Sequence, residues 1–175
     1  MNHSDHVNLI RGGVTPGVWA DFGSGGGAFT LALADLLGGK GEIYSIDRDG
    51  RALDQQRGAM RAQFPDRTLH YLTADFTHAL DLPPLDGVVM ANSLHFVREK
   101  NPVLKRMRDY LKPGARLILV EYNTDSGNTW VPYPLAFETW QTLAGQNGFG
   151  DTRLIGAHPS RFLREIYSAL SIRAE

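Results

Sequence analysis

The segment 18–29 limits the possible folds most, because an apolar run ends in an acid and alternate glycines follow it. Residues 18–22 are typical of a buried strand, and an apolar helical pattern begins at Phe29. Between them lie Gly23, Gly25 and Gly27. Glycine allows positive φ and a close approach of ligand to backbone, and the free N–H groups at the helix start face the same place. The segment predicts a strand–loop–helix cradle for a nucleotide-type cofactor.

Strand-like and helix-like segments alternate along most of the chain, which is typical of a parallel sheet wound with helices. We expect an α/β fold of Rossmann-like, doubly wound type, with a seven-stranded, mostly parallel sheet and an antiparallel C-terminal strand. The expected strands are 18–22, 42–46, 68–73, 87–91, 116–122, 152–157 and 165–173. Helices are expected from about residues 29, 49, 102 and 135.

Glycine and proline mark where several of these elements end. Gly38 and Gly39 provide a C-cap for the first of these helices, and Pro65 ends the second. Asn101 followed by Pro102 resembles an N-cap with proline at the first helical position. We expect one domain over residues 1–175, since this length is typical of a single hydrophobic core.

Composition excludes several classes of function. The chain has no cysteine, which excludes disulfides, thiolate metal sites, cysteine nucleophiles and iron–sulfur clusters. A formal net charge of −1 speaks against generic nucleic-acid binding. No apolar run approaches the roughly 20 residues that span a bilayer, and the first residues do not resemble a signal peptide. We expect a cytoplasmic monomer or homodimer without membrane contact.

The glycine loop alone leaves two cofactor classes open. Residues 23–28 also satisfy the dinucleotide pattern G-x-G-x-x-G/A, with Asp47 near the position that binds a ribose. Asp21 argues against a dinucleotide, since its carboxylate comes two residues before the first glycine. A pyrophosphate there would be destabilised by roughly 1 to 4 kcal/mol. An ammonium and a sulfonium would be attracted instead.

Four short motifs together resemble the class I (Rossmann-like) S-adenosylmethionine-dependent methyltransferases over nearly the whole chain. The first is the acid and glycines of 21–27, which is similar to the family's acidic G-x-G-x-G motif. The others are 44–48 with Asp47, 74–76 with Asp75, and the turn 111–117. The resemblance implies that Asp47 holds the ribose hydroxyls of S-adenosylmethionine and that Asp75 takes its adenine amino group.

From these motifs we predict a cofactor-binding set whose members follow the strands or cover the loop: Arg11, Asp21, Gly23, Ser24, Gly25, Asp47, Arg48, Asp75, Phe76 and Asn92. The resemblance places the segment 7–11 over the cofactor, so Arg11 faces either the methionine carboxylate or solvent. Asp47 has a helix cap as its alternative role, and Asp75 a turn cap. Ser93 or Asn92 is expected to cap the next helix, with the backbone at this point meeting the amino group of the cofactor.

His95 is the candidate general base, because imidazole titrates near neutrality; a structural or helix-capping histidine is the alternative. The aromatic side chains Trp130, Tyr133 and Phe137 form either a substrate lid or ordinary core. His3 and His6 have an H-x-x-H spacing, but they lie near an end of the chain that we expect to be flexible. No metal site is therefore predicted.

These observations predict methyl transfer to a small-molecule acceptor on oxygen, nitrogen or carbon. The run Asn92-Ser93-Leu94-His95 differs from the Asn/Asp-Pro-Pro-Tyr/Phe run of methyltransferases that act on nucleobase or glutamine amino groups. Two alternatives stay open: an NAD(P)-dependent oxidoreductase, and a non-catalytic protein that binds S-adenosylmethionine.

Overall fold

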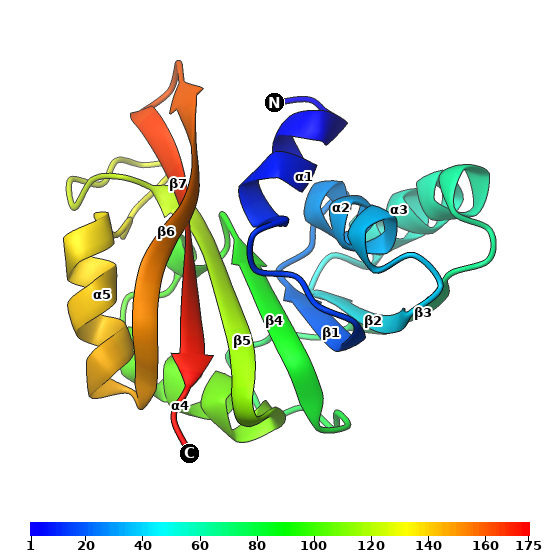
Figure 1. Ribbon diagram of the computed structural model, residues 1–175. Coiled ribbons are helices and arrows are strands. Elements are labelled where there is room, and N and C mark those ends of the chain that lie inside the picture. The colour runs from blue at the N-terminus through cyan, green and yellow to red at the C-terminus, as the bar shows by residue number, and fades with distance from the viewer.

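A computed structural model describes residues 1–175 and contains one seven-stranded sheet (Figure 1). The strands are β1 (Gly17–Phe22), β2 (Gly41–Asp47), β3 (Thr68–Thr73), β4 (Leu85–Ala91), β5 (Leu111–Tyr122), β6 (Phe149–Ser160) and β7 (Arg164–Arg173). Their order across the sheet is β3-β2-β1-β4-β5-β7-β6. Strands β1 to β5 are parallel, whereas β7 is antiparallel to both β5 and β6. The predicted sheet is confirmed.

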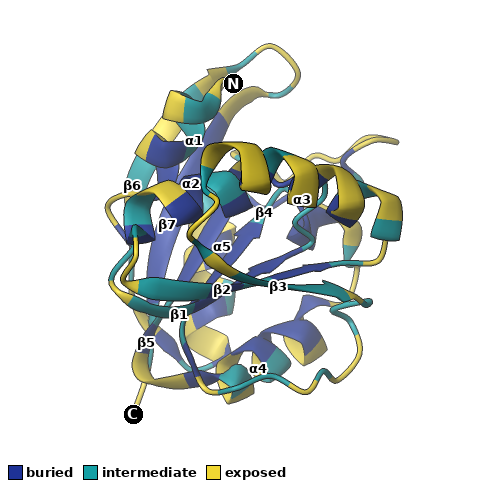
Figure 2. Cartoon of the chain, turned by 90° about the vertical axis from the view of Figure 1, so that its right-hand side faces the viewer, coloured by how far each residue is buried: buried dark blue, intermediate teal, exposed yellow.

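Helices cover both faces of this sheet (Figures 1 and 2). One face carries α1 (His3–Ile10), α2 (Ala28–Leu37) and α3 (Gly50–Gln63), and the other carries α4 (Lys100–Tyr110) and α5 (Phe137–Gln146). Alternate residues of β1 enter opposite cores, because successive side chains of a strand point to opposite faces. Trp19 belongs to the core under α1 to α3, and Ala20 to the core under α4 and α5.

The predicted ends of α2 and α3 agree with the structure, whereas α4 starts earlier than predicted and α5 begins at Phe137 rather than at about residue 135. The C-cap of α2 is Gly38, and α3 lies between the N-cap Asp49 and the C-cap Phe64. The N-cap of α4 is Glu99 rather than Asn101, and Pro102 stands inside the first turn. Proline is accepted there because the first N–H groups of a helix have no intrahelical partner.

The later strands are longer than predicted. Strand β5 begins at Leu111, so the predicted turn 112–114 lies within its bounds, where pairing with β4 shifts register between Leu85 and Gly87. Strand β6 exceeds the predicted 152–157 at both ends, since its pairing with β7 continues past two register shifts. No helix of the chain combines the length and the apolarity needed to cross a membrane.

The first residues form helix α1, which contradicts the expected flexible end. Asn2 and Asp5 form a capping box, in which each side chain accepts a hydrogen bond from the other's backbone N–H. His3 lies 3.1 Å from the Asp35 carboxylate of α2, and His6 packs edge-on against Phe29. Both histidines therefore have structural neighbours that fasten α1 to α2.

Candidate functional site

The loop after β1 needs glycine at two positions for different reasons. Gly23 has φ +76°, and a Cβ there would lie 2.5 Å from the Ser93 Cβ. Gly25 has φ +52°, but a Cβ there would meet no atom within 4 Å. Packing and backbone conformation thus fix Gly23, whereas Gly25 leaves open space above the loop. A ligand can approach the backbone at this point.

Two cavities meet at this loop, where the parallel strands end. The first has a volume of about 390 Å³ and the second about 410 Å³, and they share Gly23, Gly25 and Asn92. The first extends past Asp47 toward the segment after β3, and the second extends past Asp21 and Ser24 to helix α1. Of the ten predicted cofactor residues, the structure brings nine to these cavities.

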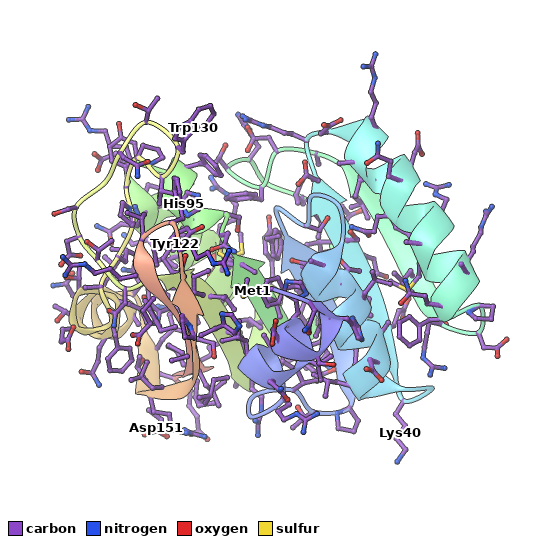
Figure 3. The ribbon with its side chains drawn as sticks, turned by 90° about the horizontal axis from the view of Figure 1, so that it is seen from above. Met1, Lys40, His95, Tyr122, Trp130 and Asp151 are labelled. Carbon is purple, nitrogen blue, oxygen red and sulfur yellow. The ribbon has the colours of Figure 1, made fainter.

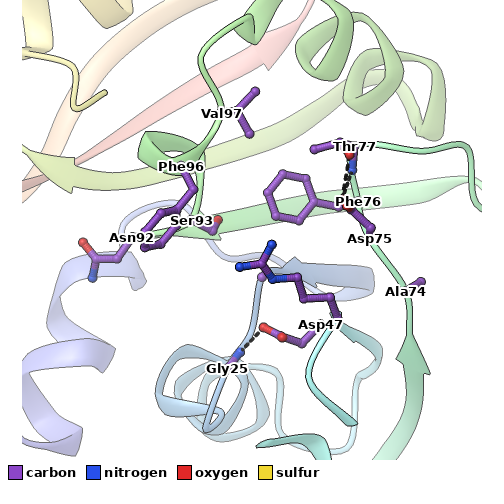
Figure 4. Close-up of a pocket in the computed structure, with 12 residues that line it drawn as sticks. Gly25, Asp47, Ala74, Asp75, Phe76, Thr77, Asn92, Ser93, Phe96 and Val97 are labelled. Atoms are coloured by element: carbon purple, nitrogen blue, oxygen red, sulfur yellow. Dashed lines mark hydrogen bonds between the residues drawn. The ribbon is translucent and has the colours of Figure 1, made fainter. Parts of the chain in front are cut away.

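Asp47 anchors the glycine loop as well as lining the first cavity. Its Oδ2 accepts a hydrogen bond from the Gly25 N–H at 2.7 Å (Figure 4), and its Oδ1 accepts one from the Asp49 N–H at 2.8 Å. The N-cap of α3 is Asp49, so the alternative of Asp47 as the helix cap is wrong. A carboxylate has lone pairs beyond these two bonds, so Asp47 can still accept from a ligand hydroxyl.

Asp75 lines the same cavity and also caps the turn after β3. Its Oδ1 accepts hydrogen bonds from the Thr77 N–H at 2.8 Å and the Thr77 hydroxyl at 2.7 Å, which lower the pKa of Asp75. Figure 4 shows Phe76 and Phe96 projecting into the cavity from the segments after β3 and β4, and Arg48 is a further lining residue. This end of the cavity offers aromatic faces and an ionised acid.

Asp21 lies in the wall of the second cavity, and its surroundings correct the expectation of a fixed negative charge. The residue is 1% exposed, and its Oδ2 accepts a hydrogen bond from the Thr30 hydroxyl at 2.6 Å. Burial raises the pKa of Asp21 to about 7, although the Thr30 bond acts in the opposite direction. A cation placed in the second cavity would therefore favour loss of the Asp21 proton.

Asn92 stands between the two cavities with an unused hydrogen-bond acceptor. It has φ +52°, which asparagine tolerates better than most residues, and its buried Oδ1 has no partner in the chain. The hydroxyl of Ser93 donates to the Phe22 carbonyl at 2.7 Å. Ser93 is the N-cap residue of the short 3₁₀-helix η1 (Leu94–Phe96), as predicted, but its side chain makes no capping hydrogen bond there.

Arg11 is the predicted cofactor residue that the structure does not bring to the site. It is the exposed C-cap of α1 and lines neither cavity. Met1 and His6, toward the other end of α1, line the second cavity instead. An eight-residue helix is about 12 Å long, so its N-terminal end lies over the site while its C-terminal end, with Arg11, lies away from it.

A buried histidine–glutamate pair lies behind the first cavity: Ser93 and Phe96 line that cavity, whereas His95 and Glu121 line neither of the two. The His95 Nδ1 is 2.9 Å from Oε1 and 3.0 Å from Oε2 of Glu121, and the two side chains are 4% and 0% exposed. The sequence places Glu121 at this edge as a strand-end residue but assigns it no role. A carboxylate at Nδ1 favours the tautomer with its proton on that atom, which leaves Nε2 as an acceptor.

Aromatic side chains surround the His95 ring. The rings of Phe96 and Tyr122 have centroids 4.3 Å and 6.1 Å from it, and Phe162 from the β6–β7 turn lies 5.9 Å from Tyr122. Phe96 is 60% exposed and Phe162 is 50% exposed. Large apolar side chains gathered at a surface often mark a binding site.

The three predicted lid residues have different surroundings. Trp130 is 75% exposed in the loop 123–136, and Figure 3 shows it on the same side of the molecule as His95 and Tyr122. The N–H of Tyr133 donates to the His95 carbonyl at 2.9 Å. Phe137 packs against the buried Tyr167 with ring centroids 5.9 Å apart, which agrees with its alternative role as core.

Lys100 fastens this loop and carries no signal in the sequence. Its Nζ donates to the Val97 carbonyl at 2.7 Å and to the Tyr133 carbonyl at 2.8 Å. Burial lowers the pKa of Lys100, while the charge of Glu121 acts in the opposite direction. The buried ammonium thus connects the segment after η1 to the loop 123–136.

Comparison with known proteins gives a family match and several relatives. A family model described as "Methyltransferase domain" matches residues 20–117. The chain is 30% identical over 114 residues to the ubiquinone/menaquinone biosynthesis C-methyltransferase UbiE of Shewanella sp. (strain W3-18-1), covering 63% of this chain and 45% of the relative. It is 28% identical over 116 residues to the 2-phytyl-1,4-naphtoquinone methyltransferase of Trichormus variabilis, covering 63% and 49%. The chain spans about half the length of these two curated relatives.

Solved structures share the fold. The magnesium protoporphyrin IX methyltransferase ChlM from Synechocystis PCC 6803, solved with bound S-adenosylmethionine, superposes with a TM-score of 0.75 at 19% identity. The match covers 98% of this chain and 77% of that chain. At this level of identity, the similarity concerns the fold alone.

Proposed function

The chain belongs to the methyltransferase domain family, and we propose that it transfers a methyl group from S-adenosylmethionine to a small-molecule acceptor. The observation that carries the proposal is the pair of acids on the two sides of one glycine loop. Asp47 lines the first cavity and Asp21 the second, and both cavities reach Gly25. One elongated ligand that spans both cavities would meet a carboxyl group on each side of the loop.

The residue types fit the two ends of S-adenosylmethionine. Carboxylate oxygens of Asp47 accept from ribose hydroxyls, and Asp75 with Phe76 would hold the adenine. Asp21 would face the cationic methionine end, where its carboxyl group becomes ionised as the cation approaches. The unpartnered Oδ1 of Asn92 provides an acceptor between the two ends. A pyrophosphate offers hydrogen-bond acceptors only, so it fits these acids poorly.

When bound, S-adenosylmethionine supplies a methyl group on a positively charged sulfur. Methyl transfer then depends mainly on how the chain positions the acceptor and excludes water. His6 of helix α1 and Met1, which precedes this helix, line the second cavity, and Phe96 borders the first. The aromatic rings of Phe96, Tyr122 and Phe162 would hold the apolar part of the acceptor.

His95 would take the proton that the acceptor loses. With Glu121 at Nδ1, the Nε2 atom is the free acceptor on the other side of the ring. The Glu121 carboxylate would stabilise the imidazolium that results, because both side chains are buried and opposite charges attract more strongly away from water. This role suits an acceptor with an acidic O–H, N–H or C–H group.

The relatives suggest the kind of acceptor. Two of them are named as quinone-pathway methyltransferases, and the exposed aromatic rings near His95 suit a flat, apolar molecule. The net charge of −1 gives no reason to expect a nucleic acid. We therefore propose a small, ring-containing acceptor, with Trp130 and Tyr133 beside its entrance.

The proposal is tested by incubating the purified chain with S-adenosylmethionine and a panel of phenols, quinols and enolisable ketones. Formation of S-adenosylhomocysteine together with a methylated product would support it. Tight binding of S-adenosylmethionine without turnover on any compound or on a metabolite extract would instead support a non-catalytic binding protein. Oxidation of NADH or NADPH by the chain would support an oxidoreductase.

A further inference from the structure

A third hollow lies away from the two cavities at the glycine loop, between the C-terminal half of α3 and strand β3. It has a volume of about 280 Å³ and shares no lining residue with either of those cavities. Three of its eight lining residues are the arginines Arg57, Arg61 and Arg67, and none is acidic. Figure 3 shows α3 on the opposite side of the molecule from His95. The hollow is therefore a separate candidate site.

The three arginines have no carboxylate partner. Every ion pair of the chain involves a histidine or a lysine, so none includes Arg57, Arg61 or Arg67. The guanidinium groups of Arg57 and Arg61 also donate no hydrogen bond within the chain. They are four residues apart on one helix, where like charges repel. The positive charge of the hollow is left uncompensated by the chain itself.

Aromatic rings hold two of the guanidinium groups in place. The Arg57 guanidinium lies 4.8 Å from the Tyr71 ring centroid, and that of Arg67 lies 5.8 Å from the Phe64 centroid. Arg67 also donates from Nε to the Ala34 carbonyl at 3.1 Å. A stacked guanidinium keeps the N–H groups at its edge available for an anion. The arginines are thus partly oriented before any ligand binds.

The chemistry of the hollow selects the class of ligand. A phosphate monoester carries about −1.5 to −2 charges at pH 7 and three acceptor oxygens. It can therefore pair with several guanidinium groups at once, more readily than a ligand with a single carboxylate can. The buried Met60, with Phe64 and Leu69, gives the hollow an apolar part. We propose that the hollow binds a small organic phosphate monoester, with the phosphate on the arginines and the organic part on these apolar side chains.

Calorimetric titration of the chain with phenyl phosphate tests this, without S-adenosylmethionine, so that the result is independent of the proposed function. We expect one saturable site with a Kd of about 0.1 to 1 mM. Inorganic phosphate, which lacks the ring, and phenyl sulfate, which has a single charge, are each expected to bind about 10-fold more weakly. No saturable binding up to about 10 mM would overturn the proposal.

Variants distinguish a built site from general attraction of anions. Arg57→Gln and Arg61→Gln change exposed side chains that make no hydrogen bond, so the fold should persist; each is expected to raise the Kd for phenyl phosphate about 10-fold. Arg51→Gln removes the same charge from an exposed position of α3 outside the hollow and is expected to change it less than about 2-fold. Equal effects of all three variants would contradict the proposal.

Discussion

The proposed cofactor side of the site, around the two cavities at the glycine loop, and the proposed acceptor side, around His95, are held together in different ways. On the cofactor side, Asp47 and Asp75 bond to backbone N–H groups of the loops and turns beside them, within the segment 20–117 that the family model matches. On the acceptor side, His95 of η1 pairs with Glu121 of β5, and Tyr133 and Phe162 come from outside that segment. Local motifs thus shape one side, and long-range packing shapes the other.

Changes of acceptor are therefore expected to arise on the acceptor side rather than around the glycine loop. The cofactor side uses backbone and carboxyl groups next to parallel strands, so its chemistry is tied to the fold. The acceptor side uses a loop and the β6–β7 turn, which tolerate substitution more readily. If the two sides are independent, a variant on one side should leave the measured property of the other unchanged.

The largest effect is expected for His95→Ala. Loss of a general base typically lowers the rate by about 100- to 10,000-fold, while the Kd for S-adenosylmethionine should change less than about 3-fold. Rates of S-adenosylhomocysteine formation and calorimetry measure the two quantities. His70→Gln is the matched control, because His70 pairs with Glu42 at a partly exposed position on β3. If His95→Ala forms S-adenosylhomocysteine as fast as the unaltered chain, His95 is not the general base.

A smaller effect is expected for Asp47→Ala on cofactor binding. The loss of charge-assisted hydrogen bonds should raise the Kd for S-adenosylmethionine about 10- to 100-fold. Asp49→Ala is the control, since it removes the cap of α3 and should lower the free energy of unfolding by about 1 kcal/mol without a comparable loss of affinity. Equal affinities of the two variants in calorimetry would argue against a ribose contact.

Asp21 is expected to make both stability and affinity depend on pH. Its folded pKa of about 7 exceeds the ordinary value of 3.8, so the folded state holds more protons between these values. Stability is therefore lost as the pH rises through this window. Asp21→Asn, which cannot ionise, should have a higher free energy of unfolding than the unaltered chain at pH 8, by an amount on the order of a few kcal/mol, and this advantage should fade toward pH 4.

Asp21→Asn should also bind S-adenosylmethionine about 10-fold more weakly at pH 8, because the asparagine side chain offers no negative charge to the cationic end of the cofactor. In the unaltered chain, affinity should rise with pH up to about 7 and then level off. Thermal melts and calorimetry across pH 5 to about 8 measure both trends. A pH-independent affinity would mean that Asp21 does not face a cation.

The smallest effects are expected in the loop that borders the acceptor. Trp130→Ala removes an exposed side chain, so the free energy of unfolding should change by less than about 0.5 kcal/mol, while KM for the acceptor should rise several-fold. Phe137→Ala should behave oppositely, losing about 1 to 3 kcal/mol because the ring packs on Tyr167. Urea unfolding and steady-state kinetics separate the two. A lid role for Trp130 fails if KM is unchanged.

The sequence predicts the cofactor side well because its signals are local. Alternate glycines and strand-end acids specify β1, β2 and their loops, and they correctly place Asp21, Asp47 and Asp75 at the cavities. Their contacts with S-adenosylmethionine stay predictions. The protonation of Asp21 was not predictable, because it depends on complete burial that only the packed fold provides.

The acceptor side was predicted less completely. No short motif connects His95 to Glu121, which lie 26 residues apart in the chain, or brings Phe162 to Tyr122. The position of Arg11 depends on where α1 begins, and the capping box that starts this helix at Asn2 turns Met1 rather than Arg11 toward the cavity. Such contacts arise from packing between distant segments, which periodicity does not encode.

Calorimetric titration of the unaltered chain with S-adenosylmethionine and, separately, with NAD⁺ decides which cofactor the glycine loop binds. We expect saturable binding of S-adenosylmethionine with one ligand per chain, together with proton release near pH 7 as Asp21 ionises, and no measurable binding of NAD⁺. Tight binding of NAD⁺ with no heat from S-adenosylmethionine would contradict this expectation.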